Sequence, residues 1–237
     1  MSAPRANNAR TIAGPPRFTA IAALGCATVL IAGFVFIAAV WPLFGIKNAA
    51  DVADADKILP AVANYPILMI FNALDVPVSV LLLLVARGLR AQIPPGVRAG
   101  LAQAAVLVAG ACFFALGVLR LVGYAQLASL YGRDPAGATS AYATMYAVQD
   151  TIDGVAIFAV GCWLAVTNWL ALKAHHLPVP LAAVGLLAGT CAVAASAVHA
   201  AQPVALVLML TWFAWLGVEL LRAGGSVADA KPVAVPA

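Results

Sequence analysis

Long apolar runs, separated by short polar stretches, make up most of this chain. A helix needs about 20 apolar residues to cross the hydrocarbon core of a bilayer. The runs that meet this length lie near residues 18–44, 66–86, 101–126, 143–170, 179–199 and 203–222. Prolines and glycines, which end helices, stand between them, as in Pro94-Pro95-Gly96. The pattern predicts an all-α, polytopic membrane protein, a bundle of six transmembrane helices.

The composition agrees with a membrane environment. Of the 237 residues, 64% are hydrophobic and 9% are charged, whereas a soluble domain carries about 25% charged residues. The net charge of +4 comes from Lys and Arg residues that are spread thinly between the apolar runs. They mark membrane topology rather than a basic patch, so no nucleic-acid partner is expected and the predicted partner is the lipid bilayer.

Basic residues fall mainly on one side of a six-span arrangement. Nine lie on that side: Arg5, Arg10, Arg17, Arg87, Arg90, Arg98, Lys173, Arg222 and Lys231. Only Lys47, Lys57 and Arg133 lie on the other side. Because Lys and Arg in short loops favour the cytoplasm, both termini are predicted to be cytoplasmic in a multi-pass protein of a bacterial cytoplasmic (inner) membrane.

Three regions follow from this topology. Residues 1–17 form a cytoplasmic basic tail, residues 18–222 the six-helix transmembrane domain, and residues 223–237 a disordered cytoplasmic tail. The first apolar run is too long for a cleavable signal peptide, whose apolar region has about 7–15 residues. It is therefore predicted to be retained as the first helix.

Four charged residues lie within the predicted spans: Asp75, Arg120, Asp150 and Asp153. Each costs roughly 2.5–3.5 kcal/mol at the centre of a membrane helix on the insertion scale, so each should face protein or water. With a rise of about 1.5 Å per residue, Arg120 lies about 9 Å from the outer end of its span, and the aspartates lie about 10–14 Å in. All four are predicted to lie in the outer half of the bilayer.

Other polar side chains share faces with these charges. On the fourth span, Tyr142 and Tyr146 precede the acidic residues at helical spacing. Pro77 cannot donate to the carbonyl of residue 73, which is expected to kink the second span and leave that oxygen free. The candidate ligand or proton site consists of Asn72, Asp75, Arg120, Tyr124, Tyr146, Gln149, Asp150 and Asp153.

Two interpretations of this site stay open. Three carboxylates against one guanidinium leave an excess of negative charge, which a proton, a cation or a small ligand would relieve in a transport or sensing role. Alternatively, the charges only clamp the helices of a structural or interaction subunit. A membrane-embedded enzyme ranks third, since no nucleophile, metal-ligand set or cofactor motif is complete. No catalytic residue, metal or cofactor is predicted.

Two further features bear on packing and partners. Asp51, Asp54 and Asp56 lie in the loop between the first two spans and are expected to form a solvated acidic cap. Gly185 and Gly189 form a GxxxG motif, which lets helix backbones approach closely. The partner helix could belong to this chain or to another one.

Short segments also resemble a known family. They are Arg17-Phe-Thr-Ala-Ile-Ala-Ala-Leu-Gly25, Leu119-Arg120-Leu-Val, and Leu177-Pro178-Val-Pro-Leu181 continuing to Gly185. They resemble the uncharacterised bacterial membrane family catalogued as domain of unknown function 4386. An acidic residue often follows the third-span arginine in that family, where this chain has Leu121-Val-Gly. The resemblance implies a membrane architecture and no particular activity.

Overall fold

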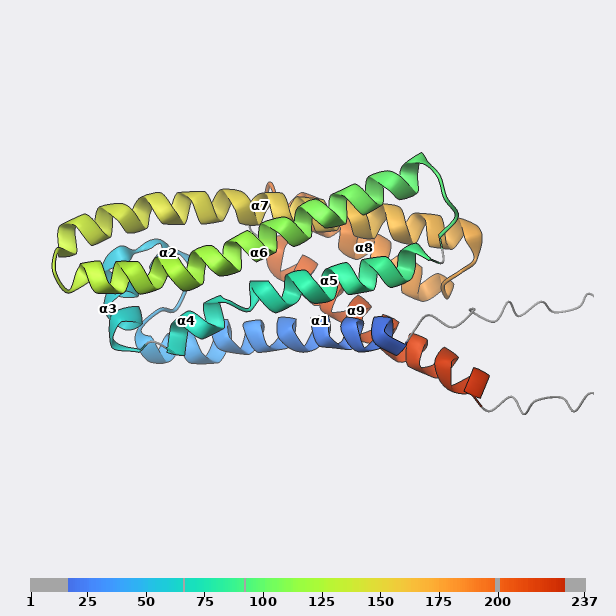
Figure 1. Ribbon diagram of the computed structural model, residues 1–237, viewed down its shortest axis with the longest axis horizontal. Coiled ribbons are helices and arrows are strands. Elements are labelled where there is room, and N and C mark those ends of the chain that lie inside the picture. The colour runs from blue at the N-terminus through green and yellow to red at the C-terminus, as the bar shows by residue number, and fades with distance from the viewer. Residues whose placement is uncertain (1–16, 66, 92, 199–200, 229–237) are drawn as a thin grey trace, which may run out of the picture.

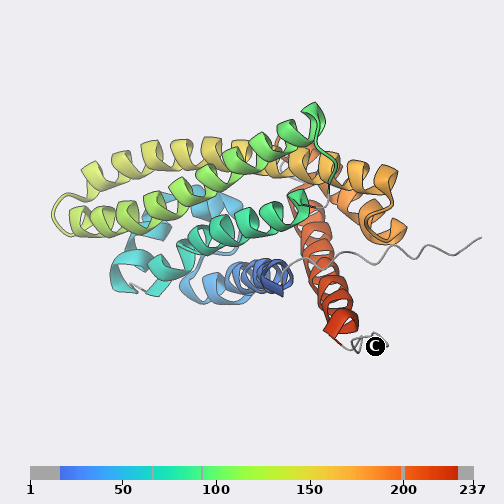
Figure 2. The ribbon, with the colours of Figure 1, turned by 45° about the vertical axis from the view of Figure 1, so that its right-hand side comes forward.

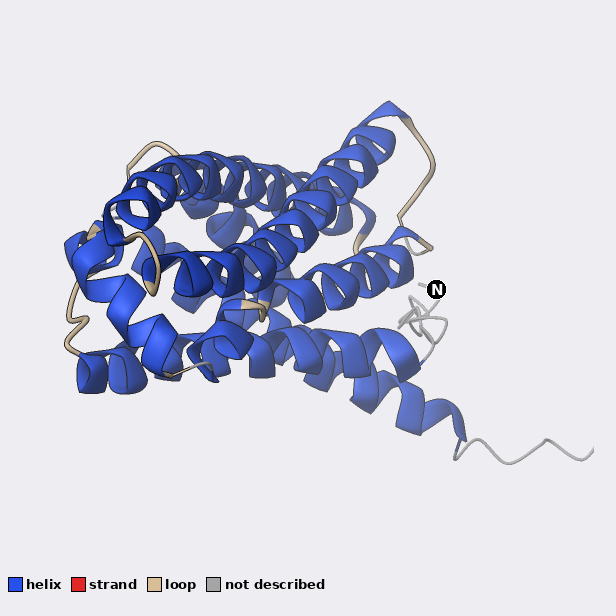
Figure 3. Cartoon of the chain, turned by 60° about the vertical axis from the view of Figure 1, so that its left-hand side comes forward, coloured by secondary structure: helices blue, strands red, loops and turns tan. Residues whose placement is uncertain are grey.

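The protein is helical throughout its described part in a computed structural model, which describes residues 17–65, 67–91, 93–198 and 201–228 (Figures 1 and 3). The elements are α1 (Arg17–Val35), η1 (Phe36–Val40), η2 (Trp41–Phe44), α2 (Ala49–Ala53), α3 (Ala55–Asn64), α4 (Ile67–Asn72), α5 (Asp75–Arg90), α6 (Val97–Tyr131), α7 (Pro135–Ala174), α8 (Val179–Ala195) and α9 (Gln202–Ala228). The prediction of an all-α protein is confirmed for these residues. Of the expected tails, residues 1–16 and 229–237 lie outside them, whereas Arg17 begins α1 and residues 223–228 belong to α9.

Four of these helical stretches are long and apolar enough to cross a bilayer. They are Arg17–Phe44, Val97–Tyr131, Pro135–Ala174 and Gln202–Ala223, and the shorter α8 is also apolar. Many large apolar side chains on these helices are exposed, including Phe18, Leu101, Phe114 and Val207. Side chains of this kind are stable when lipid replaces water around them. These are the properties of an integral membrane protein.

The long helices pack in a closed ring in the order α1, α5, α6, α7, α8, α9 and back to α1. Small residues and Leu side chains fill its core, with Trp163 and Trp212 in edge-to-face contact at 5.9 Å between ring centroids. α6 and α7 form the longest hairpin, and α9 runs steeply across it (Figure 2). The ring brings α5, α6 and α7 side by side, which positions the polar residues predicted on these helices.

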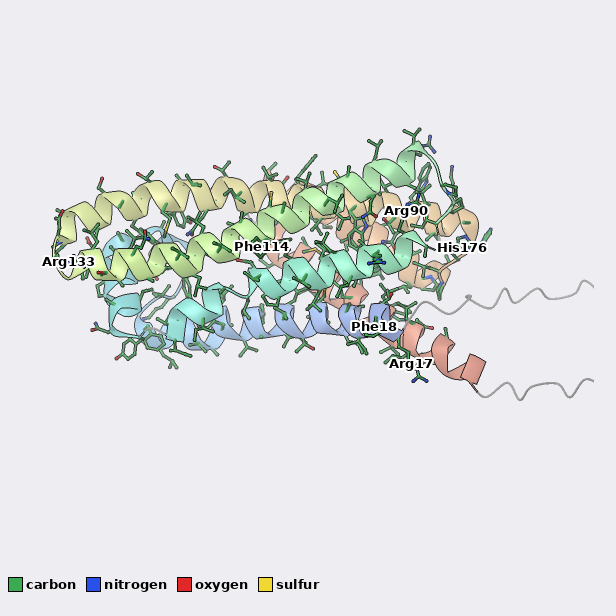
Figure 4. All side chains as sticks on the ribbon, viewed as in Figure 1. Arg17, Phe18, Arg90, Phe114, Arg133 and His176 are labelled. Carbon is green, nitrogen blue, oxygen red and sulfur yellow. The ribbon has the colours of Figure 1, made fainter. Side chains whose placement is uncertain are left out.

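The two ends of the bundle differ in charge. Arg17, Arg90 and His176 lie at one end, named the basic end below, and Arg133 lies at the opposite, distal end (Figure 4). The turn at Gly132 to Asp134 that joins α6 to α7 is therefore as far from the basic end as the bundle allows. This separation agrees with the charge asymmetry in the sequence.

The α6–α7 hairpin extends beyond the spans predicted for it. α6 continues to Tyr131 and α7 begins at Pro135, because the Asp134 side chain caps α7 by accepting a hydrogen bond from the Gly137 N–H at 3.0 Å. The extra turns pack against η1, η2, α2 and α3, here called the distal cap, around a second core that includes Phe36, Ile58 and Tyr142.

The predicted solvated acidic loop is wrong for Asp51. This residue is buried, and its carboxylate accepts hydrogen bonds from the backbone N–H groups of Lys47 and Asn48 and from the Lys57 side chain. Asp54 caps α3. The loop folds into α2 and α3 because its carboxylates accept hydrogen bonds from backbone N–H groups at helix starts. The number of acidic residues in the loop does not reveal this capping role.

The GxxxG glycines pack within the chain. A Cβ atom on Gly189 would lie 2.5 Å from the Ala165 N, and one on Gly185 would lie 2.3 Å from the Asn168 side chain. Both neighbours belong to α7. Close backbone approach of α8 to α7 therefore accounts for both glycines. In the structure, the helix that packs against the GxxxG motif belongs to the same chain.

Candidate functional site

A break between α4 and α5 places Asp75 at the start of a helix. Pro77 has no N–H for the Ala73 carbonyl, and the helix restarts at Asp75. The Ala73 carbonyl is not left free as the sequence suggests, because it accepts a hydrogen bond from the Val76 N–H at 3.0 Å. The Asp75 carboxylate lies in the first turn of α5, where the helix dipole stabilises negative charge.

Gly117 brings α6 close to this break. A Cβ atom there would lie 2.5 Å from Val76 Cγ2 and 2.9 Å from the Val76 N, so a larger residue would push α6 away. Arg120 follows one turn later and donates from Nη1 to Asp75 Oδ2 at 2.6 Å. The two side chains are 25% and 19% exposed, so the ion pair is shielded but reachable.

Acidic residues of α7 face the same region. Asp153 is half-buried and close enough to Asp75 to interact with it electrostatically. The Tyr146 side chain interacts electrostatically with Asp150, Asp153 and Arg120, and Asp150 is exposed. The structure thus brings together five of the predicted site residues from three helices, as the shared helix faces predict.

Tyr124 lies within electrostatic range of Arg120 and Tyr146, two other residues of the predicted site. It is buried, and its ring centroid lies 6.2 Å from that of Tyr142. Tyr142 stacks on Tyr146 at 6.1 Å and donates to the Val52 carbonyl in α2. These tyrosines form a column that joins the charge cluster to the distal cap.

Gln149 contributes a buried amide to the α7 face. Its side chain is 4% exposed, and within the described residues its Nε2 atom has no hydrogen-bond partner. A buried donor without a partner costs about 1–3 kcal/mol. The Asn72 side chain, also predicted for the site, lies outside the described part of the structure. Among the described residues, no group of three or more His, Cys, Asp or Glu is placed to hold a metal ion.

On α6 and α7 the large exposed apolar side chains end close to the level of the ion pair, whereas Ile67 and Ile70 on α4 are exposed farther toward the distal end. Large exposed apolar side chains on α6 extend to Val122, and on α7 they begin at Val148. Arg120 is two residues inside the α6 limit, or about 3 Å at a helical rise of about 1.5 Å per residue. Farther along α6, Ala125 and Gln126 are exposed. The depth of about 9 Å in a bilayer stays a prediction.

A polar contact deep in the bundle was missed by reasoning from the sequence. Asn168 is fully buried, donates to the Leu164 carbonyl at 2.8 Å and accepts from Trp212 Nε1 at 3.0 Å. Its side chain lies over Gly185, so it joins α7, α8 and α9. The sequence signal that could have indicated this contact was a single Asn within the apolar run of residues 163–172. Because these bonds lie within the protein, the contact is structural.

No protein-family model, curated protein or solved structure matches this chain. The resemblance to the family of unknown function therefore stays a prediction. What the protein does has to follow from its own residues.

Proposed function

We propose that this membrane protein binds a proton or a small cation at the cluster of Asp75, Arg120, Asp150 and Asp153, in a transport or sensing role. One observation carries the proposal: Arg120 is bonded to Asp75 at 2.6 Å, while Asp153 adds a second carboxylate within electrostatic range of the first. Like charges this close favour uptake of a positive charge.

The surroundings of the cluster suit such a ligand. The partial exposure of Arg120 and Asp75 gives access from water, while the neighbouring helices lower the local dielectric and strengthen each interaction. Tyr146 lies beside the carboxylates, and the Gln149 amide on the same helix has an unused donor. A bound water or an oxygen-bearing ligand would satisfy that donor.

We also propose the topology within which this site works. Six spans result if α4 with α5 forms the second and the 17-residue α8 forms the fifth. Both termini then lie in the cytoplasm of a bacterial inner membrane, and the cluster faces outward. The positions of Arg17, Arg90 and Arg133 support this orientation under the positive-inside rule.

The test is the melting temperature of detergent-purified protein between pH 5 and 9, with chlorides of sodium, potassium, magnesium and calcium and with a small primary amine. Wild type is expected to be stabilised by lower pH or by one of the cations. The shift should disappear in Asp153→Asn, which leaves the Arg120 to Asp75 pair in place. Asp56→Asn removes an exposed carboxylate from α3 and should keep the wild-type shift in melting temperature.

Two results would count against the binding site. One is a wild-type protein whose melting temperature responds to none of these conditions. The other is an equal response in wild type and Asp153→Asn, which would place the responsive group elsewhere.

The alternative is that the cluster only clamps the helices, and the short Arg120 to Asp75 contact across α5 and α6 favours it. Removing one partner of a buried ion pair costs about 3–5 kcal/mol, whereas removing both often costs less. The clamp therefore predicts strong destabilisation of Arg120→Gln that Asp75→Asn partly reverses, with no cation response in wild type.

A further inference from the structure

A cavity at the basic end lies between the start of α6 and the end of α7, far from the charge cluster. It has a volume of about 600 Å³ and is lined by Pro94, Pro95, Gly96, Val97, Arg98, Ala99, Leu170, Lys173 and Ala174. The lining contains two cations and no carboxylate, and its other members are apolar residues and a glycine. Such a cavity suits a ligand that is anionic at one end and apolar at the other.

Both cations contact one aromatic ring. The Arg98 guanidinium carbon lies 4.7 Å from the Trp169 ring centroid, and Lys173 Nζ lies 4.0 Å from it. Cation–π contact holds the two charged groups near each other despite their mutual repulsion. Arg98 and Lys173 remain exposed, so an anion can reach them.

The loop that forms one wall of the cavity is held in place. Arg90 at the end of α5 donates from Nη1 to the Ile93 carbonyl at 3.0 Å, just before Pro94 and Pro95. The two prolines restrict the backbone further. The cavity is therefore formed before a ligand arrives, which lowers the entropy lost on binding.

The position of the cavity beside the apolar surface favours a lipid headgroup over a free anion as its ligand. Val97 and Leu101 on α6 are exposed next to the cavity, and they continue into the apolar belt of the bundle. Trp residues commonly lie at the headgroup level of a bilayer, and Trp169, whose ring contacts both cations, would mark this level here. A lipid placed here would have its phosphate at the cations and its acyl chains along α6.

We propose that this cavity binds the headgroup of an anionic phospholipid, with Arg98 and Lys173 on the phosphate and Trp169 at the glycerol level. The site rests on charge complementarity and on its continuity with the lipid-facing surface. It is independent of the charge cluster at the distal end.

Lipid retention by purified protein tests the proposal. Wild type and the Arg98→Gln/Lys173→Gln double variant would be exchanged into mixed micelles with phosphatidylglycerol or phosphatidylcholine, and bound lipid measured by native mass spectrometry. Each basic residue near an anionic surface contributes about fivefold in affinity, so the double variant should bind phosphatidylglycerol roughly 30-fold more weakly. Wild type should prefer phosphatidylglycerol, and added salt should weaken this binding.

Matched controls distinguish binding at this cavity from a general effect of positive charge on the protein. Arg87→Gln removes an exposed cation from the last turn of α5, outside the cavity lining, and should keep wild-type binding. Arg98→Lys keeps the charge and should bind within a few-fold of wild type.

Three outcomes would overturn the proposal. They are equal binding of the two lipids by wild type, equal loss of phosphatidylglycerol in Arg87→Gln and the double variant, and displacement of the bound lipid by inorganic phosphate at equal concentration. The last result would assign the cations to a free anion.

Discussion

The Arg120 to Asp75 pair is tolerated because of where it lies. A charge at the centre of a bilayer is costly, and the cost falls where water and lipid headgroups can reach the side chain. Arg120 lies about 3 Å inside the limit of the exposed apolar residues of α6, and its partner lies at a helix N-terminus that favours negative charge. Both effects lower the desolvation penalty that a central pair would bear.

Asp51 is the residue whose protonation should affect the distal cap most. Hydrogen bonding from the Lys57 side chain, and then from the Lys47 N–H, lowers the pKa of Asp51 below its ordinary value of about 3.9. A carboxyl whose pKa is lower in the folded state stabilises the fold above its unfolded pKa, and this contribution is lost as the pH falls through the folded pKa.

We therefore expect Asp51→Asn to loosen the distal cap at pH 7 and to differ little from wild type once the pH is below the lowered pKa that Asp51 has in the folded state. Hydrogen exchange of α2 and α3, corrected for the intrinsic effect of pH, measures this difference. Asp56→Asn serves as the control and should match wild type at both pH values. If the difference between Asp51→Asn and wild type persists unchanged in acid, ionisation of Asp51 is not its cause.

At the scale of elements, α7 connects α6 to α8 in the ring of helices. Its distal part faces α6 and α3, and its basic-end part faces α8. A Cβ atom on Gly161 would lie 2.8 Å from the Gly189 carbonyl oxygen and 2.8 Å from the Val193 N, both on α8. Since a backbone cannot move aside as a side chain can, this crossing tolerates only glycine.

Gly161→Ala is expected to separate α7 from α8 and to destabilise the protein by about 1–3 kcal/mol, the usual cost of overpacking. Gly154 lies on the same helix, seven residues earlier, and a Cβ atom added there would meet no atom within 4 Å. Gly154→Ala should therefore be neutral or stabilising by up to about 1 kcal/mol through helix propensity. Melting temperatures of the two variants test the contrast, and equal effects would contradict the close crossing.

At the scale of the whole molecule, the ring of helices separates two chemically different ends. The basic end carries the Arg98 and Lys173 cavity, and the distal end carries the charge cluster and its cap. The deep polar contact between Asn168 and Trp212 lies between them and is satisfied within the protein. Each end is thus expected to bind its own class of ligand.

Reporter fusions in a bacterial host test the proposed orientation. Alkaline phosphatase, which is active only outside the cytoplasm, should be active when inserted in the turn at Gly132 to Asp134 and inactive when fused after Ala237. A fluorescent protein fused after Ala237 should be fluorescent. The reverse pattern would show that the basic end faces outward, against the positive-inside rule.

The sequence by itself determined the helical, membrane-embedded character of the chain, because apolar runs of about 20 residues have few other stable states. It also determined which helix faces carry the charges, since helical spacing fixes that from local geometry. Spacing and charge together predicted that Arg120 meets one or more of the three aspartates, and the structure identifies Asp75 as a partner.

Only the tertiary structure decided how these parts are used. The hydrogen bond from Tyr142 to the Val52 carbonyl joins elements far apart in the chain, whereas the bonds that Asp51 accepts come from residues three to six positions away. The partial exposure of Arg120 depends on how α5, α6 and α7 pack, and the cavity beside Trp169 depends on the juxtaposition of α6 and α7. Local sequence determines helices and faces, whereas the pairing of those faces is set by packing over the whole chain.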